Sequence, residues 1–165
     1  MAYFSKTERD KWYNSLPALP VGAKLLLSNP QGEYLLVKPN YRPGWQFVGG
    51  VVEKDESPLQ AALREMQEEI GLVLETSRLT FKGVGYESPE EGHTAVLCVM
   101  FAAMLTDEEA AQIRLQATEL SAFKFVQPDA LPAADANPSL HEALALLRHH
   151  LEVGYVEDGE LTVNT

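Results

Sequence analysis

The clearest periodic pattern of apolar side chains lies between Ser57 and Gly71. Apolar residues recur there at steps of three and four, which is the spacing of one helix face: Leu59, Ala62, Leu63, Met66 and Ile70. Ser57 can cap the first turn, and Gln60 can complete a capping box with it. Gly71 suits the left-handed position that follows a last turn. The sequence therefore predicts a helix over 58–70 with this stripe against a core.

Short apolar runs separated by turn signals predict strands in the rest of the chain. We expect strands over 21–27, 34–38, 45–48, 79–85, 94–105 and 123–126. Capping and apolar spacing predict three further helices, over 5–15, over 107–113 and from 137 onward, the last with apolar positions Leu140, Leu144, Leu147 and Leu151. The turn signal Asp158-Gly159 predicts a terminal hairpin, with an arm onto a neighbouring subunit as the alternative.

The N-terminal helix carries Trp12 and Tyr13 on its apolar side, ahead of a proline-spaced strap that ends at Pro20. We expect both aromatic rings to pack against the body of the protein, with a binding role for Trp12 as the alternative.

Length, composition and charge narrow the class of protein. The 165 residues are 45% hydrophobic, which favours one folded domain. The longest apolar run, 95–105, is too short to span a membrane, and the first ten residues lack a signal-peptide core. The single cysteine, Cys98, and these absences together favour a cytoplasmic protein. A net charge of −11 without a basic cluster disfavours binding to long nucleic acid.

Three glutamates lie off the apolar stripe of the predicted helix. Glu65, Glu68 and Glu69 stand at i, i+3 and i+4, so their carboxylates project from neighbouring places on one face. Near the helix C-terminus they meet each other's charge and the negative end of the helix dipole. A hard divalent ion such as Mg²⁺ would relieve this repulsion, because it prefers carboxylate oxygens. The alternative is a solvated acidic face, and the capped helix beside Gly49-Gly50 favours the metal.

The wider spacing around these glutamates resembles the box of the Nudix hydrolases. It comprises Gly50, Glu56 and the run Arg64-Glu65-Met66-Gln67-Glu68-Glu69-Ile70-Gly71-Leu72. The resemblance implies an α/β fold, an α/β/α sandwich with a central mixed sheet. We expect an N-terminal helix and strap over 1–20, the Nudix hydrolase domain over 21–152 and a tail or hairpin over 153–165, all within one domain. The family usually has proline before the two glycines, where this chain has Val48.

The resemblance also implies an activity and a set of roles. The activity is hydrolysis of a diphosphate bond in a nucleoside diphosphate linked to another group, by a water that Mg²⁺ or Mn²⁺ activates. Glu65 and Glu69 would be the main metal ligands, with Glu68 and the Gly49 carbonyl as further ligands. Glu56 and Arg64 would pair and, with Gly50, support the site. The general base stays open among the glutamates Glu65, Glu68, Glu69 and Glu119. Glu119 precedes the strand predicted over 123–126, and the alternative for it is a loop residue without a role.

The loop after the second predicted strand is where members of this family often contact the substrate. Lys38 or Arg42 can contact a phosphate, and Tyr41 or Trp45 can stack on a base. As solvated charges and core aromatics, the same residues need no function. We expect a small nucleotide-type substrate of unidentified kind and a homodimer as a possible assembly.

Two alternatives to hydrolysis remain at the level of the sequence. One is a catalytically silent module of the same fold that senses a nucleotide, although such a module would be expected to have a broken box or an attached DNA-binding region. The other is a diphosphate isomerase, which would rely on a site cysteine, whereas Cys98 lies within an apolar run.

Overall fold

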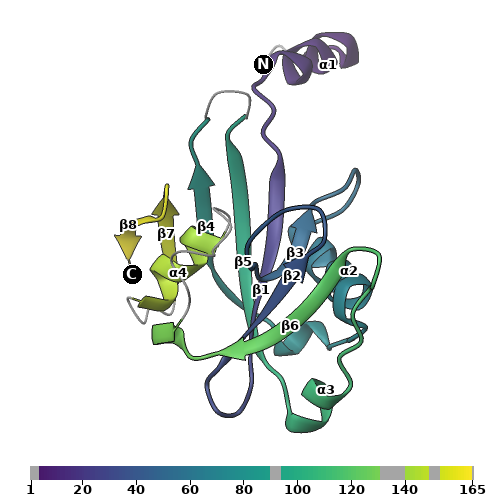
Figure 1. Cartoon of the computed structure of the whole chain (residues 1–165). Coiled ribbons are helices and arrows are strands. Elements are labelled where there is room, and N and C mark those ends of the chain that lie inside the picture. The colour runs from purple at the N-terminus through teal and green to yellow at the C-terminus, as the bar shows by residue number, and fades with distance from the viewer. Residues whose placement is uncertain (1–3, 90–93, 131–139, 149–152, 165) are drawn as a thin grey trace.

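A mixed β-sheet forms the centre of the computed structural model, which describes residues 4–89, 94–130, 140–148 and 153–164 (Figure 1). The strands run in the order β6-β2-β1-β5-β4-β7-β8, and β3 pairs with β1 beside this path. β1 is parallel to β5 and β4 is parallel to β7, whereas the other pairs of described strands are antiparallel. The strands are β1 (Val21–Ser28), β2 (Tyr34–Pro39), β3 (Val48–Val51), β4 (Thr80–Glu87), β5 (Val96–Met104), β6 (Leu120–Val126), β7 (Gly154–Glu157) and β8 (Glu160–Asn164).

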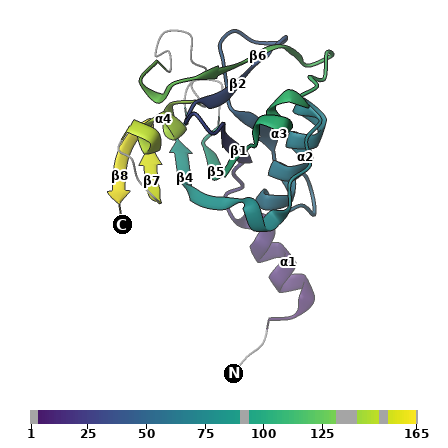
Figure 2. The same ribbon diagram turned by 90° about the horizontal axis from the view of Figure 1, so that it is seen from below.

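One helix packs on each face of this sheet. Met66 and Ile70 of α2 (Pro58–Ile70) share a buried cluster with Ala23, Leu25 and Leu27 of β1. α4 (His141–Arg148) covers the other face, where its apolar residues join a second cluster with Leu26, Phe47 and Met100. Figure 2 shows the two helices on opposite sides of the strands. The predicted α/β/α sandwich with a mixed sheet is therefore confirmed.

The helix α2 forms for the reasons that its sequence indicates. The Ser57 side chain accepts a hydrogen bond from the Gln60 backbone N–H, and the Gln60 side chain accepts one from the Ser57 N–H, which completes a capping box. Gly71 ends the helix in the left-handed region, with φ 71°. The backbone N–H groups of Arg114 and Gln116 then bond to carbonyls of the last turn. Both ends of α2 are therefore fixed in place.

The predicted strand over 45–48 is wrong, because the observed strand begins three residues later. Gln46 makes only an isolated bridge with Val37, and the strand itself is β3, which begins at Val48. Gly49 and Gly50 therefore lie inside a strand that pairs with β1, opposite Lys24 and Ala23. The absence of a side chain on Gly49 makes this pairing possible, because a Cβ there would lie 2.1 Å from the Ala23 carbonyl oxygen.

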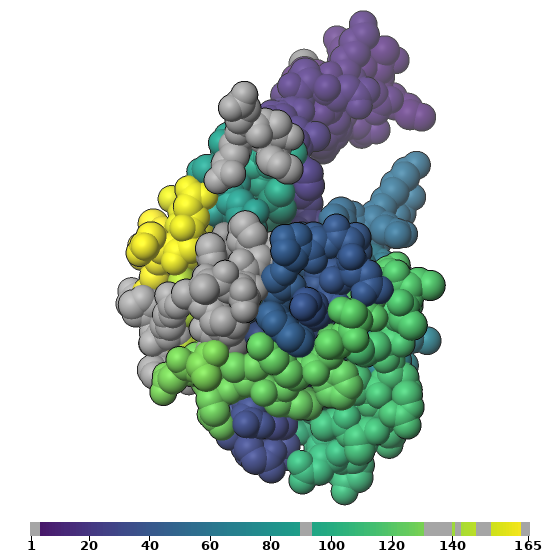
Figure 3. Space-filling model, in the orientation of Figure 1, coloured from purple at the N-terminus to yellow at the C-terminus, as the bar shows by residue number. Residues whose placement is uncertain are grey.

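The packing expected for the N-terminal helix is also wrong. α1 (Lys6–Ser15) buries none of its residues, and Trp12 and Tyr13 are 54% and 59% exposed. The two rings contact each other instead, with centroids 5.0 Å apart. Figures 1 and 3 show α1 standing away from the body on the strap that leads into β1. The physical reason is that two adjacent aromatic residues do not make a stripe along a helix.

The remaining predicted elements are found with shifted ends. The short helix α3 (Asp107–Ala111) stops two residues early, and β6 begins three residues early at Leu120. The C-terminal hairpin of β7 and β8 is confirmed, with Asp158 and Gly159 at positive φ in its turn. The predicted start of the last helix at 137 and its apolar position 151 lie outside the described residues. None of the described helices combines the length and the apolar character that crossing a bilayer requires.

Candidate active site

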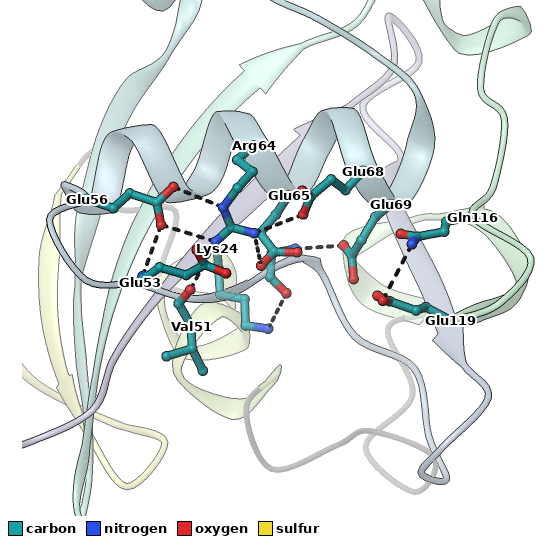
Figure 4. Close-up of polar contacts among 11 residues, drawn as sticks. Lys24, Val51, Glu53, Glu56, Arg64, Glu65, Glu68, Glu69, Gln116 and Glu119 are labelled. Carbon is teal, nitrogen blue, oxygen red and sulfur yellow. Dashed lines mark hydrogen bonds and ion pairs between the residues drawn. The ribbon is translucent and has the colours of Figure 1, made fainter.

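The predicted site residues come together where α2 packs against β3 (Figure 4). The helix presents Glu65 and Glu69 toward the strand that carries Gly49 and Gly50, whereas the Glu68 carboxylate contacts Arg64. Their exposure differs, because Glu69 is 3% exposed, the Glu65 side chain 15% and the Glu68 side chain 51%. A uniformly solvated acidic face is therefore not what the fold contains.

Glu69 is the buried carboxylate of the site. Its Oε2 accepts a hydrogen bond of 2.9 Å from the Gly49 backbone N–H. Burial raises the pKa of the Glu69 carboxyl to about 7, although the Gly49 N–H and the Lys24 charge act in the opposite direction. The negative charges of Glu65 and Glu119 raise it further. The negative charge of Glu69 is therefore incompletely compensated by the protein.

Arg64 links the loop before α2 to the acidic turn. Its Nε lies 2.9 Å from Glu56 Oε1, which is the pair that the family resemblance implies. Its Nη1 lies 2.8 Å from Glu65 Oε1 and 2.9 Å from Glu68 Oε2, and its Nη2 donates to the Val51 carbonyl. These hydrogen bonds, led by that to Glu56, raise the pKa of Arg64, and the same contact lowers the pKa of Glu56. One guanidinium thus holds the loop, the end of β3 and two of the three glutamates.

Gly50 has a steric role in this arrangement. A Cβ at this position would lie 2.2 Å from Glu65 Oε1 and 2.6 Å from the Glu65 carboxyl carbon. The carboxylate of Glu65 therefore occupies the space that a side chain at position 50 would fill.

The donor set suits a hard divalent cation by its chemistry. Carboxylate oxygens of Glu65, Glu68 and Glu69 and the carbonyl of Gly49 are the kind of oxygen ligands that Mg²⁺ and Mn²⁺ prefer. The incompletely compensated charge of Glu69 also favours a cation beside it. As they lie, Glu65 and Glu68 are paired with Arg64. Among the described residues, no group of three or more histidine, cysteine or acidic side chains is gathered around one point as a metal would gather it.

Glu119 lies at the edge of this site, directly before β6. Its Oε1 is 3.5 Å from the Gln116 side-chain nitrogen, and its backbone carbonyl accepts from the Asn40 N–H. Its negative charge contributes to the raised pKa of Glu69. Figure 4 shows Glu119 beside Glu69, on the side away from Arg64.

The four predicted substrate-binding residues divide into two pairs. Trp45 packs on the second core cluster, and the Lys38 and Lys124 ammonium groups lie 5.9 Å and 4.1 Å from the centre of its ring. Arg42 lies over the ring of the exposed Tyr41 and contacts the side-chain oxygen of Gln46. Cys98 is buried in the second core cluster, which does not include the acidic turn of α2.

Two lysines near these groups escaped the sequence analysis. Lys24 is buried on β1, and its Nζ donates to the Gly49 carbonyl at 3.3 Å. Lys124 lies over Trp45. The sequence did contain a signal for Lys24, which is the single charge in the otherwise apolar strand segment VGAKLLL. It contained none for Lys124, because the position of Lys124 in the sheet depends on the pairing of β2 with β6.

The fold and the site together define an α/β/α protein in which a capped helix presents an acidic turn to a glycine-containing strand. Comparison with known proteins agrees with this class. The model of the NUDIX domain matches residues 18–147. An uncharacterized Nudix hydrolase of Pseudomonas aeruginosa is 30% identical over 164 residues, covering 88% of this chain and 90% of the relative. The chain belongs to the Nudix family, as its box predicted.

One other relative matches over a shorter segment, and a solved structure matches over most of the chain. An RNA pyrophosphohydrolase of Hahella chejuensis is 46% identical over 48 residues, which is 29% of this chain and 30% of that protein. The chain thus matches less than a third of that relative's length. The solved structure of the NUDIX domain of Shewanella oneidensis NrtR with ADP ribose superposes with a TM-score of 0.67 at 19% identity, covering 89% of this chain and 99% of that chain. This likeness confirms the fold, while the predicted domain limits of 21 and 152 stay predictions.

Proposed function

We propose that this protein is a divalent-metal-dependent hydrolase that cleaves a phosphoanhydride bond in a nucleoside diphosphate linked to another group. The observation that carries the proposal is the buried Glu69, held by the Gly49 N–H on the same helical turn as Glu65 and Glu68. A solvent-facing charge run would not place a carboxylate in the interior, where the charge is costly unless a cation compensates it.

In this proposal each residue has a stated task. Glu65, Glu69 and the Gly49 carbonyl hold Mg²⁺ or Mn²⁺, with Glu68 as a further ligand. When bound, the ion neutralises phosphate oxygens and lowers the pKa of the attacking water. Arg64 keeps the acidic turn and the Glu56 loop in one fixed arrangement, which orients the reacting groups.

The proton of the attacking water goes to one of four carboxylates. Glu65, Glu68, Glu69 and Glu119 are all eligible, and Glu119 is the one that does not belong to α2. The substrate's base and distal phosphates have candidate partners in Trp45 with Lys38 and in Tyr41 with Arg42, because aromatic faces stack on bases and cations pair with phosphates.

The substrate is best sought with a panel. The panel contains ADP-ribose, nucleotide sugars, dinucleoside polyphosphates, oxidised nucleoside triphosphates and a short RNA with a 5′-triphosphate, each with Mg²⁺ or Mn²⁺. ADP-ribose is included because the NrtR domain is solved with it, and the RNA because of the Hahella relative. Product identity and the phosphorus that takes up labelled oxygen from water define the reaction. Binding of one compound without turnover of any would instead support a nucleotide-sensing module.

The ligand assignment has its own test in Glu69→Gln. We expect turnover to fall by at least about a thousandfold while thermal unfolding stays cooperative, because the amide keeps the shape and loses the charge. Glu8→Gln is the matched control, since it makes the same chemical change on the exposed helix α1. Full turnover by Glu69→Gln, with metal still required, would overturn the assignment.

A further inference from the structure

Lys24 reaches the candidate metal centre from the opposite side of the sheet. Its neighbours Ala23 and Leu25 pack in the cluster under α2, whereas Leu26 packs in the cluster under α4. Because side chains alternate along a strand, Lys24 shares the face of Leu26. Its ammonium nevertheless lies 3.3 Å from the Gly49 carbonyl oxygen, since Lys24 and Gly49 are directly opposite in the pairing of β1 with β3.

The position of this ammonium is unusual for a lysine. The residue is 7% exposed, and burying an ammonium costs several kcal/mol unless hydrogen bonds and opposite charges compensate it. The Gly49 carbonyl supplies a hydrogen bond, and Glu69 supplies an attractive negative charge. Gly49 therefore connects two groups of opposite sign, with its N–H on the carboxylate of Glu69 and its carbonyl on the ammonium of Lys24.

We propose that Lys24 is a positioning residue that competes with the divalent cation for the Gly49 carbonyl, so that the free protein binds metal weakly and substrate phosphates strengthen the binding. This inference rests on the proposed function, in which the same carbonyl is a metal ligand. The lysine holds the Gly49 peptide in place when no ion is bound, and it makes metal loading depend on an anionic partner.

Electrostatics predicts how Lys24 and the nucleotide each change the affinity for the metal. A fixed positive charge beside the carbonyl repels a second cation, and burial makes this repulsion stronger than it would be in water. The repulsion on a divalent ion is twice that on a proton at the same place, so removing the lysine favours the ion even though it also favours protonation of Glu69. Diphosphate oxygens bring negative charge that offsets both cations. The coupling between metal and nucleotide is therefore positive, and Lys24 contributes to it.

The test measures Mn²⁺ binding to the metal-free full-length protein at pH 8.5, by calorimetry and by the electron paramagnetic resonance signal of free Mn²⁺. Lys24→Met removes the charge and keeps the length of the side chain, and Lys11→Met makes the same change on the exposed helix α1. We expect Lys24→Met to bind Mn²⁺ at least about tenfold more tightly than the wild type in the absence of nucleotide, with Lys11→Met unchanged.

The second arm adds a nucleoside diphosphate with a methylene bridge, which cannot be hydrolysed. We expect this nucleotide to tighten Mn²⁺ binding by a clearly larger factor in the wild type than in Lys24→Met. Lys24→Gln, which keeps a hydrogen-bond donor without the charge, repeats both arms should the methionine variant fail to fold. If Lys24 is merely structural, its replacement should change the unfolding midpoint, but the nucleotide should tighten Mn²⁺ binding by the same factor in the wild type and in Lys24→Met.

The outcomes separate the two proposals. Equal or weaker Mn²⁺ binding by folded Lys24→Met or Lys24→Gln, while the wild type binds Mn²⁺ and Glu69→Gln does not, overturns the role of Lys24 and leaves the proposed function standing. Absence of Mn²⁺ binding by the wild type, with and without the nucleotide, overturns the metal centre and the role of Lys24 together.

Discussion

The helices α1 and α2 begin with the same capping motif, but α2 packs on the core and α1 is exposed. Ser5 with Glu8 and Ser57 with Gln60 both form complete capping boxes. α2 nevertheless contributes five buried residues to the protein, and α1 contributes none. Capping therefore decides where a helix begins, and it carries no information on whether the helix packs.

The difference lies in the distribution of apolar residues along each helix. α2 has apolar residues at steps of three and four, which make a continuous stripe against β1 and β3. α1 reads KTERDKWYNS and offers only Trp12 and Tyr13, which are adjacent and project in directions about 100° apart. A helix that is to hold catalytic groups needs the first arrangement, because only packing fixes the direction of its side chains.

The largest difference between the helices is expected when a side chain on each is truncated. Met66→Ala removes a fully buried side chain of α2 and should lower the free energy of unfolding by about 2–5 kcal/mol. Trp12→Ala removes a larger but exposed side chain of α1 and should change it by less than about 0.5 kcal/mol. Urea denaturation of both variants measures the two changes in the free energy of unfolding. A loss of several kcal/mol in Trp12→Ala would mean that α1 is packed in solution, against another part of this chain or a second copy.

The sequence predicted those parts of the fold and site that depend on neighbours along the chain. The ends of α2, its cap and the direction of Glu65, Glu68 and Glu69 follow from local rules. The contact between Glu56 and Arg64 came from the family resemblance. The packing expected for α1 failed for a local reason, because its two aromatic residues make no stripe. The start of β3 and the role of Lys24 depend instead on distant segments. Gly49 allows close pairing of β3 with β1, and Lys24 meets Gly49 through that same register.

The degree of burial of each glutamate was only partly visible in the sequence. Glu68 and Glu69 are adjacent and chemically identical, yet one is half exposed and the other is almost fully buried. The difference arises from the position of β3, whose Gly49 N–H satisfies Glu69, and from Arg64, which holds Glu68 near the surface. The helix pattern gives part of this difference, because at about 100° per residue Glu69 lies beside the apolar stripe and Glu68 lies opposite it. The partner of Glu69 on β3 is not visible in that pattern.

The glutamates of the two helices should also differ in how they couple stability to pH. The Glu69 pKa is raised from 4.5 to about 7, so between these values the folded state holds more protons than the unfolded state. Stability is therefore favoured below pH 4.5 and lost as the pH rises through 7. The Glu8 pKa is lowered by its hydrogen bonds with Ser5, so Glu8 ionises at lower pH than Glu69.

Urea unfolding at pH 5 and pH 8 in the presence of a chelator measures this contrast. We expect the part of the pH dependence that Glu69→Gln removes to be on the order of 2 kcal/mol, with the wild type losing stability toward pH 8. Glu8→Gln should leave the pH dependence over this range unchanged. An identical pH dependence in the wild type and in Glu69→Gln would show that Glu69 is ionised normally, and thus that its carboxylate is not in the interior.

The smallest effect is expected when the N-cap serine of each helix is removed. Ser57→Ala and Ser5→Ala each remove a side-chain oxygen that accepts from the third backbone N–H of its helix, at 3.2 Å and 3.3 Å. Ser57→Ala should lower the free energy of unfolding by about 1 kcal/mol, because α2 unfolds only with the core on which it packs. Ser5→Ala should leave that free energy unchanged and reduce only the helical signal of α1, since a helix without core contacts can unfold alone. Amide exchange resolves the two cases, because the amides of 6–15 should then exchange faster in Ser5→Ala while those of 58–70 keep their protection. Equal losses of global stability in both variants would contradict the independence of α1, on which the comparison of the two helices depends.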